Sequence, residues 1–145
     1  MNEYITAGLF LLDAPEAFPY QNRSAPDKWS AQQILGHLID SALYNLQRFT
    51  NARLQPPPYR VKRYDQDGLV RVNAYHAANP KRLAELWYAL NKRIEAVVDD
   101  LSPAELARPV VLPDGEEATL RFLIDDYVAH GLHHLRQIRA LIGER

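Results

Sequence analysis

Histidines are the residues of this chain whose type and spacing could do chemistry. His130, His133 and His134 lie close together near the end of the sequence, and His37 lies far earlier. Neutral imidazole is a common ligand of divalent transition metals. Two imidazoles four residues apart, as in His130 and His134, lie on one face of a helix and can hold one ion. The spacing therefore raises the hypothesis of a metal site.

Helical phase separates the three neighbouring histidines. The apolar stripe of the helix that contains them consists of Leu120, Ile124, Tyr127, Gly131, Leu135 and Ile138. His134 projects inside this stripe, roughly 50° from its centre, and His130 lies one turn earlier toward the same edge. His133 projects roughly 140° away, onto the solvent side. We therefore predict that His130 and His134 point together into the protein and that His133 does not.

His37 lies at the flank of the apolar stripe of an earlier helix, and Ser41 and Asn45 follow on the same strip. If the two helices face each other, the three imidazoles could converge. Three protein ligands leave coordination positions open for water or substrate, and an all-imidazole set suits Zn²⁺, Ni²⁺, Fe²⁺ or Cu²⁺. Asp126, one turn before His130, and Gln33, one turn before His37, are candidate outer partners of the ligands.

The alternative is that these histidines are ordinary core or surface residues, because an HxxxH pair often arises by chance. His76 lies in an irregular region and is expected to be exposed, as is His133, which could also touch a dimer partner. The sequence offers no identifiable general acid or base. It contains no cysteine, so a thiol nucleophile would have to come from outside the chain.

Composition limits the other classes of function. The chain has 145 residues, enough for one domain over 1–145, and a formal net charge of −1. This balance argues against a nucleic-acid binder, and the one basic stretch, Arg60-Val-Lys62-Arg63, is short and interrupted. No apolar run approaches the roughly 20 residues of a membrane span, and the N-terminus does not resemble a signal peptide. We expect a cytoplasmic protein.

The elements that must position the histidines are predicted as helices. A short first helix is expected over about residues 2–15, with Ile5, Leu9 and Leu12 on one face. Ser30 and Gln33 form a capping box that begins a second helix, which should end near Arg53, before Pro56.

Two more long helices follow. Asn79-Pro80 begins a third, whose apolar stripe consists of Leu83, Leu86, Trp87, Leu90, Ile94, Val97 and Leu101. Ser102 and Glu105 make a second capping box, which predicts one extra turn. Residues 109–115 should form a loop or a short extended piece, and a fourth helix should run from near Thr119 to about Ile142.

Residues 54–79 form the irregular part of the chain. Asp65 and Asp67 invite a calcium interpretation, but the further oxygen ligands of an EF-hand loop are missing, so one of them more simply caps a short helix toward Tyr75. Tyr44 and Tyr64 are candidates to line a pocket. Four amphipathic helices predict an all-α, up-and-down four-helix bundle. The long connection between its second and third helices is a candidate wall or lid over a site.

Two blocks of the sequence resemble the DinB/YfiT-like superfamily. Residues 28–40, KWSAQQILGHLID, are similar to the stretch that opens its second helix, and residues 127–138, YVAHGLHHLRQI, resemble its last-helix signature. The resemblance covers essentially the whole chain in helix order and length. It implies a four-helix bundle, commonly a homodimer, with a divalent metal on His37, His130 and His134. It also implies either metal-dependent hydrolysis or the transfer of low-molecular-weight thiols such as bacillithiol or mycothiol.

Three hypotheses follow for the function. In the first, the chain is a metal-dependent enzyme, a hydrolase or thiol S-transferase, that activates water or an exogenous thiol on a three-histidine site. In the second, it is a non-catalytic stress-response module that holds a metal or a small ligand. In the third, it is a metal-free interaction bundle, which requires that His37 does not face His130.

Overall fold

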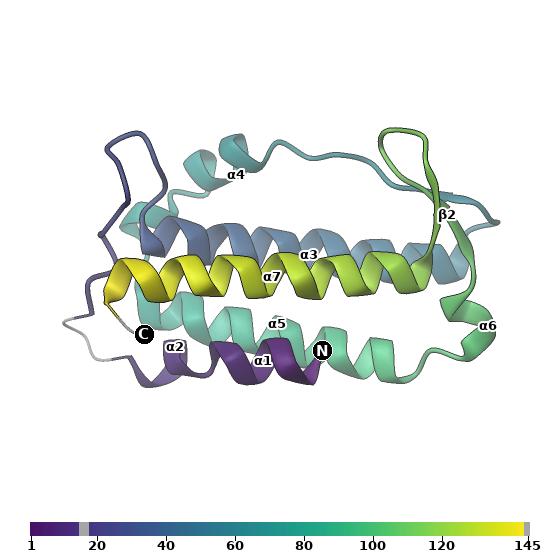
Figure 1. Ribbon diagram of the computed structural model, residues 1–145, viewed down its shortest axis with the longest axis horizontal. Helices are drawn as coiled ribbons and strands as arrows, with labels where there is room; N and C mark the ends of the chain where they lie inside the picture. Colours follow the sequence, from purple (N-terminus) through teal and green to yellow (C-terminus); the bar gives the residue numbers. More distant parts are fainter. Residues whose placement is uncertain (15–17, 144–145) are drawn as a thin grey trace.

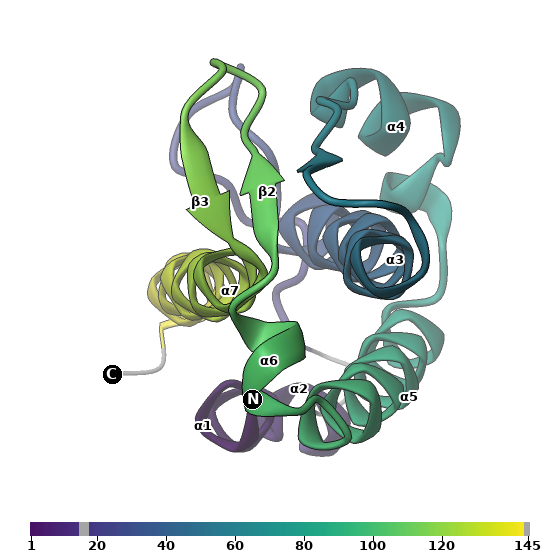
Figure 2. The same cartoon turned by 90° about the vertical axis from the view of Figure 1, so that its right-hand side faces the viewer.

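The computed structural model describes residues 1–14 and 18–143, in which long helices pack side by side and a small sheet lies at one end (Figure 1). The helices are α1 (Asn2–Gly8), α2 (Phe10–Asp13), α3 (Ala31–Leu54), α4 (Gln66–Val72), α5 (Pro80–Asp99), α6 (Pro103–Leu106) and α7 (Leu120–Ile142), with a 3₁₀ turn, η1 (Tyr75–Ala77). Viewed along the bundle, α1 with α2, α3, α5 and α7 occupy four corners (Figure 2). The predicted four-helix bundle is confirmed.

The helix starts predicted from the sequence are found in the structure. The backbone N–H of Gln33 donates to Ser30 Oγ (3.2 Å), and the N–H of Ser30 donates to Gln33 Oε1 (3.0 Å), which is the capping box that begins α3. Asn79 caps α5, and Thr119 accepts from the N–H of Phe122 at the start of α7. These local bonds satisfy N–H groups that a helix start would otherwise leave unpaired.

The first helix differs from the prediction. It is divided at Leu9 into α1 and α2, and the expected end at residue 15 lies outside the described residues. Leu9 is 40% exposed, whereas Tyr4, Gly8 and Leu11 are buried. Ile5 is buried as expected, but the rest of the buried face is displaced by one residue, because the ring of Tyr4 rather than the side chain of Leu9 fills the core. On α5, Leu86 is likewise exposed.

Aromatic side chains join α1, α5 and α7 in the core. The indole N–H of Trp87 donates to the hydroxyl of Tyr4 (2.9 Å), and the hydroxyl of Tyr127 donates to Asn91 Oδ1 (2.7 Å). Gly131 on α7 makes this packing possible, because a Cβ atom at that position would overlap the ring of Tyr4. The polar atoms of these aromatic side chains therefore have hydrogen-bond partners within the core, as burial requires.

The connection over residues 55–79 sets the direction of the helices. It leaves the end of α3, returns along the length of the bundle and enters α5 at the end where α3 began (Figure 1). Neighbouring α3 and α5 consequently run in the same direction, so the alternation of an up-and-down order is interrupted at this one place. The predicted short helix exists as α4, which lies against α3, and Asp65 caps it.

A small sheet ties this connection to the segment before α7. It contains β1 (Tyr59–Arg60), β2 (Pro109–Val111) and β3 (Glu117–Thr119) in the order β1-β2-β3. β1 pairs parallel to β2, with Tyr59 opposite Val110, and β2 pairs antiparallel to β3. The sequence predicted at most a short extended piece here, because strands of two or three residues carry no periodic pattern.

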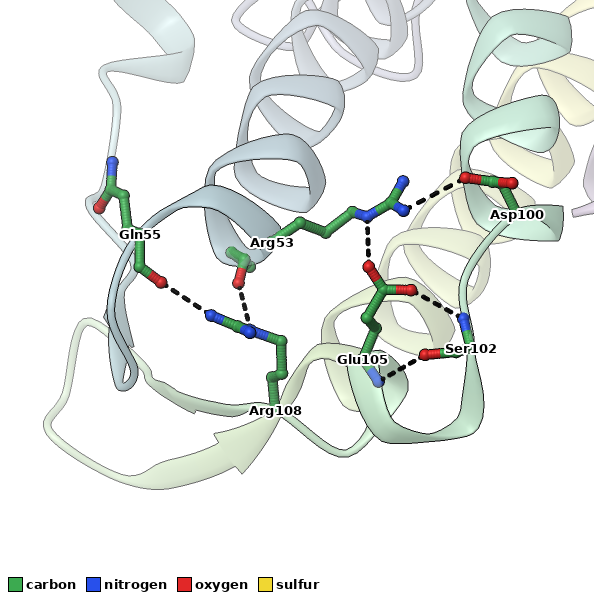
Figure 3. Close-up of polar contacts among 7 residues, drawn as sticks. Arg53, Gln55, Asp100, Ser102, Glu105 and Arg108 are labelled. Carbon is green, nitrogen blue, oxygen red and sulfur yellow. Dashed lines mark hydrogen bonds and ion pairs between the residues drawn. The ribbon is translucent and has the colours of Figure 1, made fainter.

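Two arginines fasten the end of α3 to the segments that follow α5 (Figure 3). Arg108 donates from Nε to the carbonyl oxygen of Ala52 and from Nη2 to that of Gln55, both at 2.8 Å. Arg53 donates to Glu105 (2.8 Å), whose carboxylate also completes the predicted capping box with Ser102. The last carbonyls of α3 thereby gain partners that a helix end otherwise lacks.

None of the helices in residues 1–14 and 18–143 combines the length and the apolar character that crossing a membrane demands.

Candidate metal centre

Three histidines meet between α3 and α7. One nitrogen atom from each of His37, His130 and His134 lies within 4.8 Å of the other two. Nε2 of His37 is 3.0 Å from Nε2 of His130, and the ring of His134 lies against both, with centroid distances of 4.8 and 4.5 Å. The structure therefore brings together the three residues that the sequence singled out.

The geometry follows from where each residue stands on its helix. His130 and His134 follow one another by a helical turn on α7, at the edge of its buried stripe, and His37 lies on the face of α3 that packs against α7. His133 is exposed, as predicted, and so is His76 in η1. All six residues of the predicted α7 stripe are buried, so the phase on which the prediction depended is correct.

Burial keeps the three imidazoles neutral. The side chain of His37 has no exposed surface. Desolvation, reinforced by the neighbouring His134 and His130, lowers its pKa to about 3. Desolvation is also the main reason why the pKa of His134 falls to about 4 and that of His130 falls below its usual value. Each ring can thus offer a lone pair at neutral pH, which is the state a metal ligand needs.

Gln137 orients the ring of His134. Nδ1 of His134 lies 2.7 Å from Oε1 of Gln137, so this nitrogen carries the proton and donates it to the amide oxygen. Nε2 of His134 is then the nitrogen with a free lone pair. The amide nitrogen of Gln137 lies 3.1 Å from Nε2 of His133, which extends the chain of polar contacts to the protein surface. Such an outer partner is what fixes the tautomer of a metal-binding histidine.

The two outer partners predicted from the sequence are wrong. The side chain of Gln33 is used in the capping box of α3, so Nδ1 of His37 is buried without a hydrogen-bond partner. Within the described residues, Asp126 makes no hydrogen bond to His130. Asp126 acts on His130 through its negative charge, which raises the pKa of the imidazole. The ring of Trp29 lies against His37 at 4.9 Å. One-turn spacing placed these residues nearby but could not show which bonds their side chains already make.

The donor set fits a divalent transition metal. In a tetrahedral zinc site with Zn–N bonds of about 2.05 Å, two ligand nitrogens lie roughly 3.3 Å apart. The Nε2 atoms of His37 and His130 are 3.0 Å apart, which is close to that separation. In the described part of the chain the cluster contains imidazoles only. Neutral imidazole suits zinc, nickel, copper and iron, so the chemistry of the site does not single out one of them. His37, His130 and His134 are the residues that would hold the ion.

Two pockets open beside the histidines. The first, of about 470 Å³, is lined by His130 and Tyr127 on α7, by Ser41 and Asn45 on α3, and by Tyr64 on the connection. The second, of about 610 Å³, is lined by His134 and Gln137 together with Trp29, Ile34 and Leu141. The connection therefore forms a wall of the site, as its length predicted.

Sequence reasoning missed two arginines in the first pocket. Arg48 stands one turn beyond Asn45 on α3, and Arg63 lies on the connection. The strip of Ser41, Asn45 and Arg48 along one face of a helix was the available signal for Arg48. Nothing local in the connection indicated that Arg63 faces the histidines, because an irregular segment has no helical phase from which to read a direction.

Comparison with known proteins identifies similar chains. The family model described as DinB superfamily matches residues 11–138. A protein of Oceanobacillus iheyensis named "putative metal-dependent hydrolase" is 30% identical over 113 residues, covering 78% of this chain and 64% of that protein. YfiT of Bacillus subtilis, which carries the same name, is 27% identical over 114 residues, with 78% and 64% covered. The chain thus spans slightly less than two thirds of the length of these curated relatives.

Solved structures show the same fold. The structure of YfiT from Bacillus subtilis, described as a four-helix bundle of unusual topology, aligns with a TM-score of 0.77 at 19% identity, covering 99% of this chain and 88% of that one. A mycothiol-dependent maleylpyruvate isomerase aligns with a TM-score of 0.65 at 13% identity, covering 99% and 60%. At these identities the likeness concerns the arrangement of helices.

Proposed function

The chain belongs to the DinB superfamily, and from this we propose that it is a metal-dependent enzyme whose ion is held by His37, His130 and His134. The observation that carries the proposal is the convergence of three neutral imidazole nitrogens within 4.8 Å, with a pocket on either side. A site that only stabilised the fold would use four protein ligands and be closed. Three ligands beside two pockets leave room for reactants.

Each residue of the site has a distinct task in this proposal. His37 is fully buried and anchors the site to α3, while His130 and His134 supply two ligands from α7. Gln137 holds His134 in the tautomer that presents Nε2. Tyr64 lines the pocket beside His130, and Trp29 lines the pocket beside His134. A divalent ion supplies Lewis-acid chemistry, which makes water or a thiol a good nucleophile at neutral pH.

We propose that the nucleophile is water or an exogenous low-molecular-weight thiol. The names of the curated relatives support hydrolysis. The fold shared with a mycothiol-dependent isomerase supports a thiol, and the chain itself contains no cysteine that could serve instead. The two reactions use the same polarising centre and differ in what enters the pocket.

The first test is elemental analysis of untagged protein. Wild type should carry about one equivalent of a transition metal, and His37→Ala and His134→Ala should carry almost none. His133→Ala and His76→Ala are matched controls, because both side chains are exposed and outside the cluster. Metal content that is unchanged in His37→Ala and His134→Ala would show that the ion binds elsewhere.

The second test asks for turnover. Metal-loaded wild type is assayed for hydrolysis of activated esters and amides and for displacement of halide from an activated aryl halide by bacillithiol or mycothiol. Activity should disappear with chelation and in His134→Ala. Activity that survives metal removal would contradict the mechanism. A metal-loaded protein that catalyses none of these reactions, and whose melting temperature falls sharply on chelation, would favour a binding module.

A further inference from the structure

Four cationic side chains line a small pocket, and two of them also line the first pocket described above. The smaller pocket, of about 280 Å³, is lined by Arg48, Arg60, Lys62 and Arg63, and Arg48 and Arg63 also line the pocket that reaches His130. We call these four residues the basic strip. Two of its members, Arg48 and Arg63, line the same pocket as His130. The one carboxylate among the described residues that line either pocket is that of Asp126.

The charge of the basic strip is not neutralised within the described structure. None of its four members makes an ion pair there, whereas Arg53, Arg82, Lys92 and Arg121 do. The formal net charge of the whole chain is only −1, so this is a local concentration of cations. Arginine groups without an acidic partner beside a polar pocket are a common means of recognising carboxylate and phosphate.

Arg48 is held ready for such a ligand. Its Nη2 donates to the carbonyl oxygen of Lys62 (2.6 Å), and its guanidinium carbon lies 5.3 Å from the centre of the Tyr64 ring. That ring is stacked on Tyr44, with centroids 4.1 Å apart and planes 14° apart. A guanidinium group has five N–H donors, so several remain available after the bond to Lys62. Less side-chain entropy is lost on binding when the group is already fixed.

The second pocket does not share this character. Its walls include Trp29, Ile34 and Leu141, and its lysine, Lys28, already lies 3.7 Å from the carboxylate of Asp27. The two sides of the histidine cluster therefore differ, one being cationic and the other more apolar. An acidic group on a reactant would find a partner on the side of Arg48 and Arg63.

We propose that the first pocket binds a substrate or co-substrate through an anionic group, carboxylate or phosphate, that pairs with Arg48 and Arg63 while the reacting end lies at His130. Asp126 belongs to α7, so its charge favours an orientation in which the acid lies on the side of α3 and the connection. That the bound anion is a reactant rests on the proposed function. The anion site itself does not depend on a metal, because it is formed by side chains of this chain.

The test measures the binding of anions to metal-free protein. Binding is observed by NMR, through the side-chain Nε–H signals of Arg48 and Arg63. The probes are succinate, inorganic phosphate and the uncharged succinamide. Succinate or phosphate should shift both signals, and succinamide should not. Arg48→Gln and Arg63→Gln should each weaken binding about fivefold, whereas Arg93→Gln, an exposed position on α5 that lines neither pocket, should change it less than about twofold.

The outcomes separate this inference from the proposed function. Equal binding of succinate and succinamide, or unchanged affinity in both pocket variants, would overturn the inference and leave the metal site intact. Anion binding by a protein that takes up no metal would uphold the anion site and refute the enzyme proposal. The stronger of the two charged probes identifies whether the preferred group is a carboxylate or a phosphate.

Discussion

Nε2 of His37 lies 3.0 Å from Nε2 of His130, although 93 residues separate the two in the chain. Both rings are kept neutral by burial, and both belong to long helices whose starts are fixed by local caps. Two ring nitrogens at this distance, with His134 beside them, are arranged as a shared cation would require. The predictions below concern the residues that maintain this arrangement.

Replacing Gln137 by Leu should weaken metal binding about 10–100-fold without removing a ligand, because His134 loses the acceptor that fixes its tautomer. The affinity is measured by competition with a chromogenic chelator. His133→Ala serves as the control, since the hydrogen bond of His133 goes to the other end of the Gln137 amide and leaves the bond between Gln137 and His134 in place. An affinity equal to that of wild type would show that Gln137 does not orient the ligand.

The metal-free protein should lose stability as the pH falls below 6.5. The pKa of His37 is about 3 in the folded protein, whereas an imidazole in the unfolded chain has the ordinary pKa of 6.5. Between these two pH values the unfolded chain therefore binds a proton that the folded chain does not. His37 alone should then lower the free energy of unfolding by about 1 kcal/mol between pH 6.5 and about pH 5.5. Urea unfolding at both pH values measures this, and His37→Asn should show the smaller decrease. A decrease of the same size in His37→Asn would contradict the attribution to His37.

Gly131→Ala should destabilise the protein by roughly 1–3 kcal/mol, because the added methyl group overlaps the ring of Tyr4. Since alanine favours a helix more than glycine, any loss must come from this overlap. Chemical unfolding gives the difference in stability. The reverse change at an exposed position of the same helix, Ala140→Gly, should cost only about 1 kcal/mol. A Gly131→Ala protein as stable as wild type would mean that Tyr4 can move without cost.

Arg108→Ala should reduce stability by roughly 1–2 kcal/mol, because the carbonyl oxygens of Ala52 and Gln55 lose their charged donor. The effect should appear first as faster amide exchange in the last turn of α3. Arg82→Ala is the comparison, since its ion pair with Glu85 lies on the surface of α5 and should contribute little. Equal effects of the two substitutions would argue against a fastening role for Arg108.

Much of the fold and of the histidine cluster could be predicted from local pattern. The stripe from Leu120 to Ile138 gives the phase of α7, and this phase alone separates His130 and His134 from His133. The capping boxes at Ser30 and Ser102 mark helix starts within single turns of chain. In each case the information lies within a few residues of the feature, so one sequence contains it.

Features that depend on distant partners could not be predicted in this way. The burial of Tyr4 instead of Leu9 is decided by Gly131 on another helix. The pairing of Tyr59 with Val110 joins short segments without periodicity. The position of Arg63 at the pocket depends on the path of the whole connection. Such choices are made by tertiary packing, which overrides the weak local preferences of short segments.

The path of the connection over residues 55–79 also divides the molecule into parts that can change separately. The three histidines stand on α3 and α7, whereas Arg60, Lys62, Arg63 and Tyr64 come from the connection. Substitutions or insertions in that connection can therefore alter what the pocket accepts without disturbing the helices that carry the imidazoles. A scaffold of this kind can therefore change what its pocket accepts by exchanging one surface segment, while the three histidines keep their places on α3 and α7.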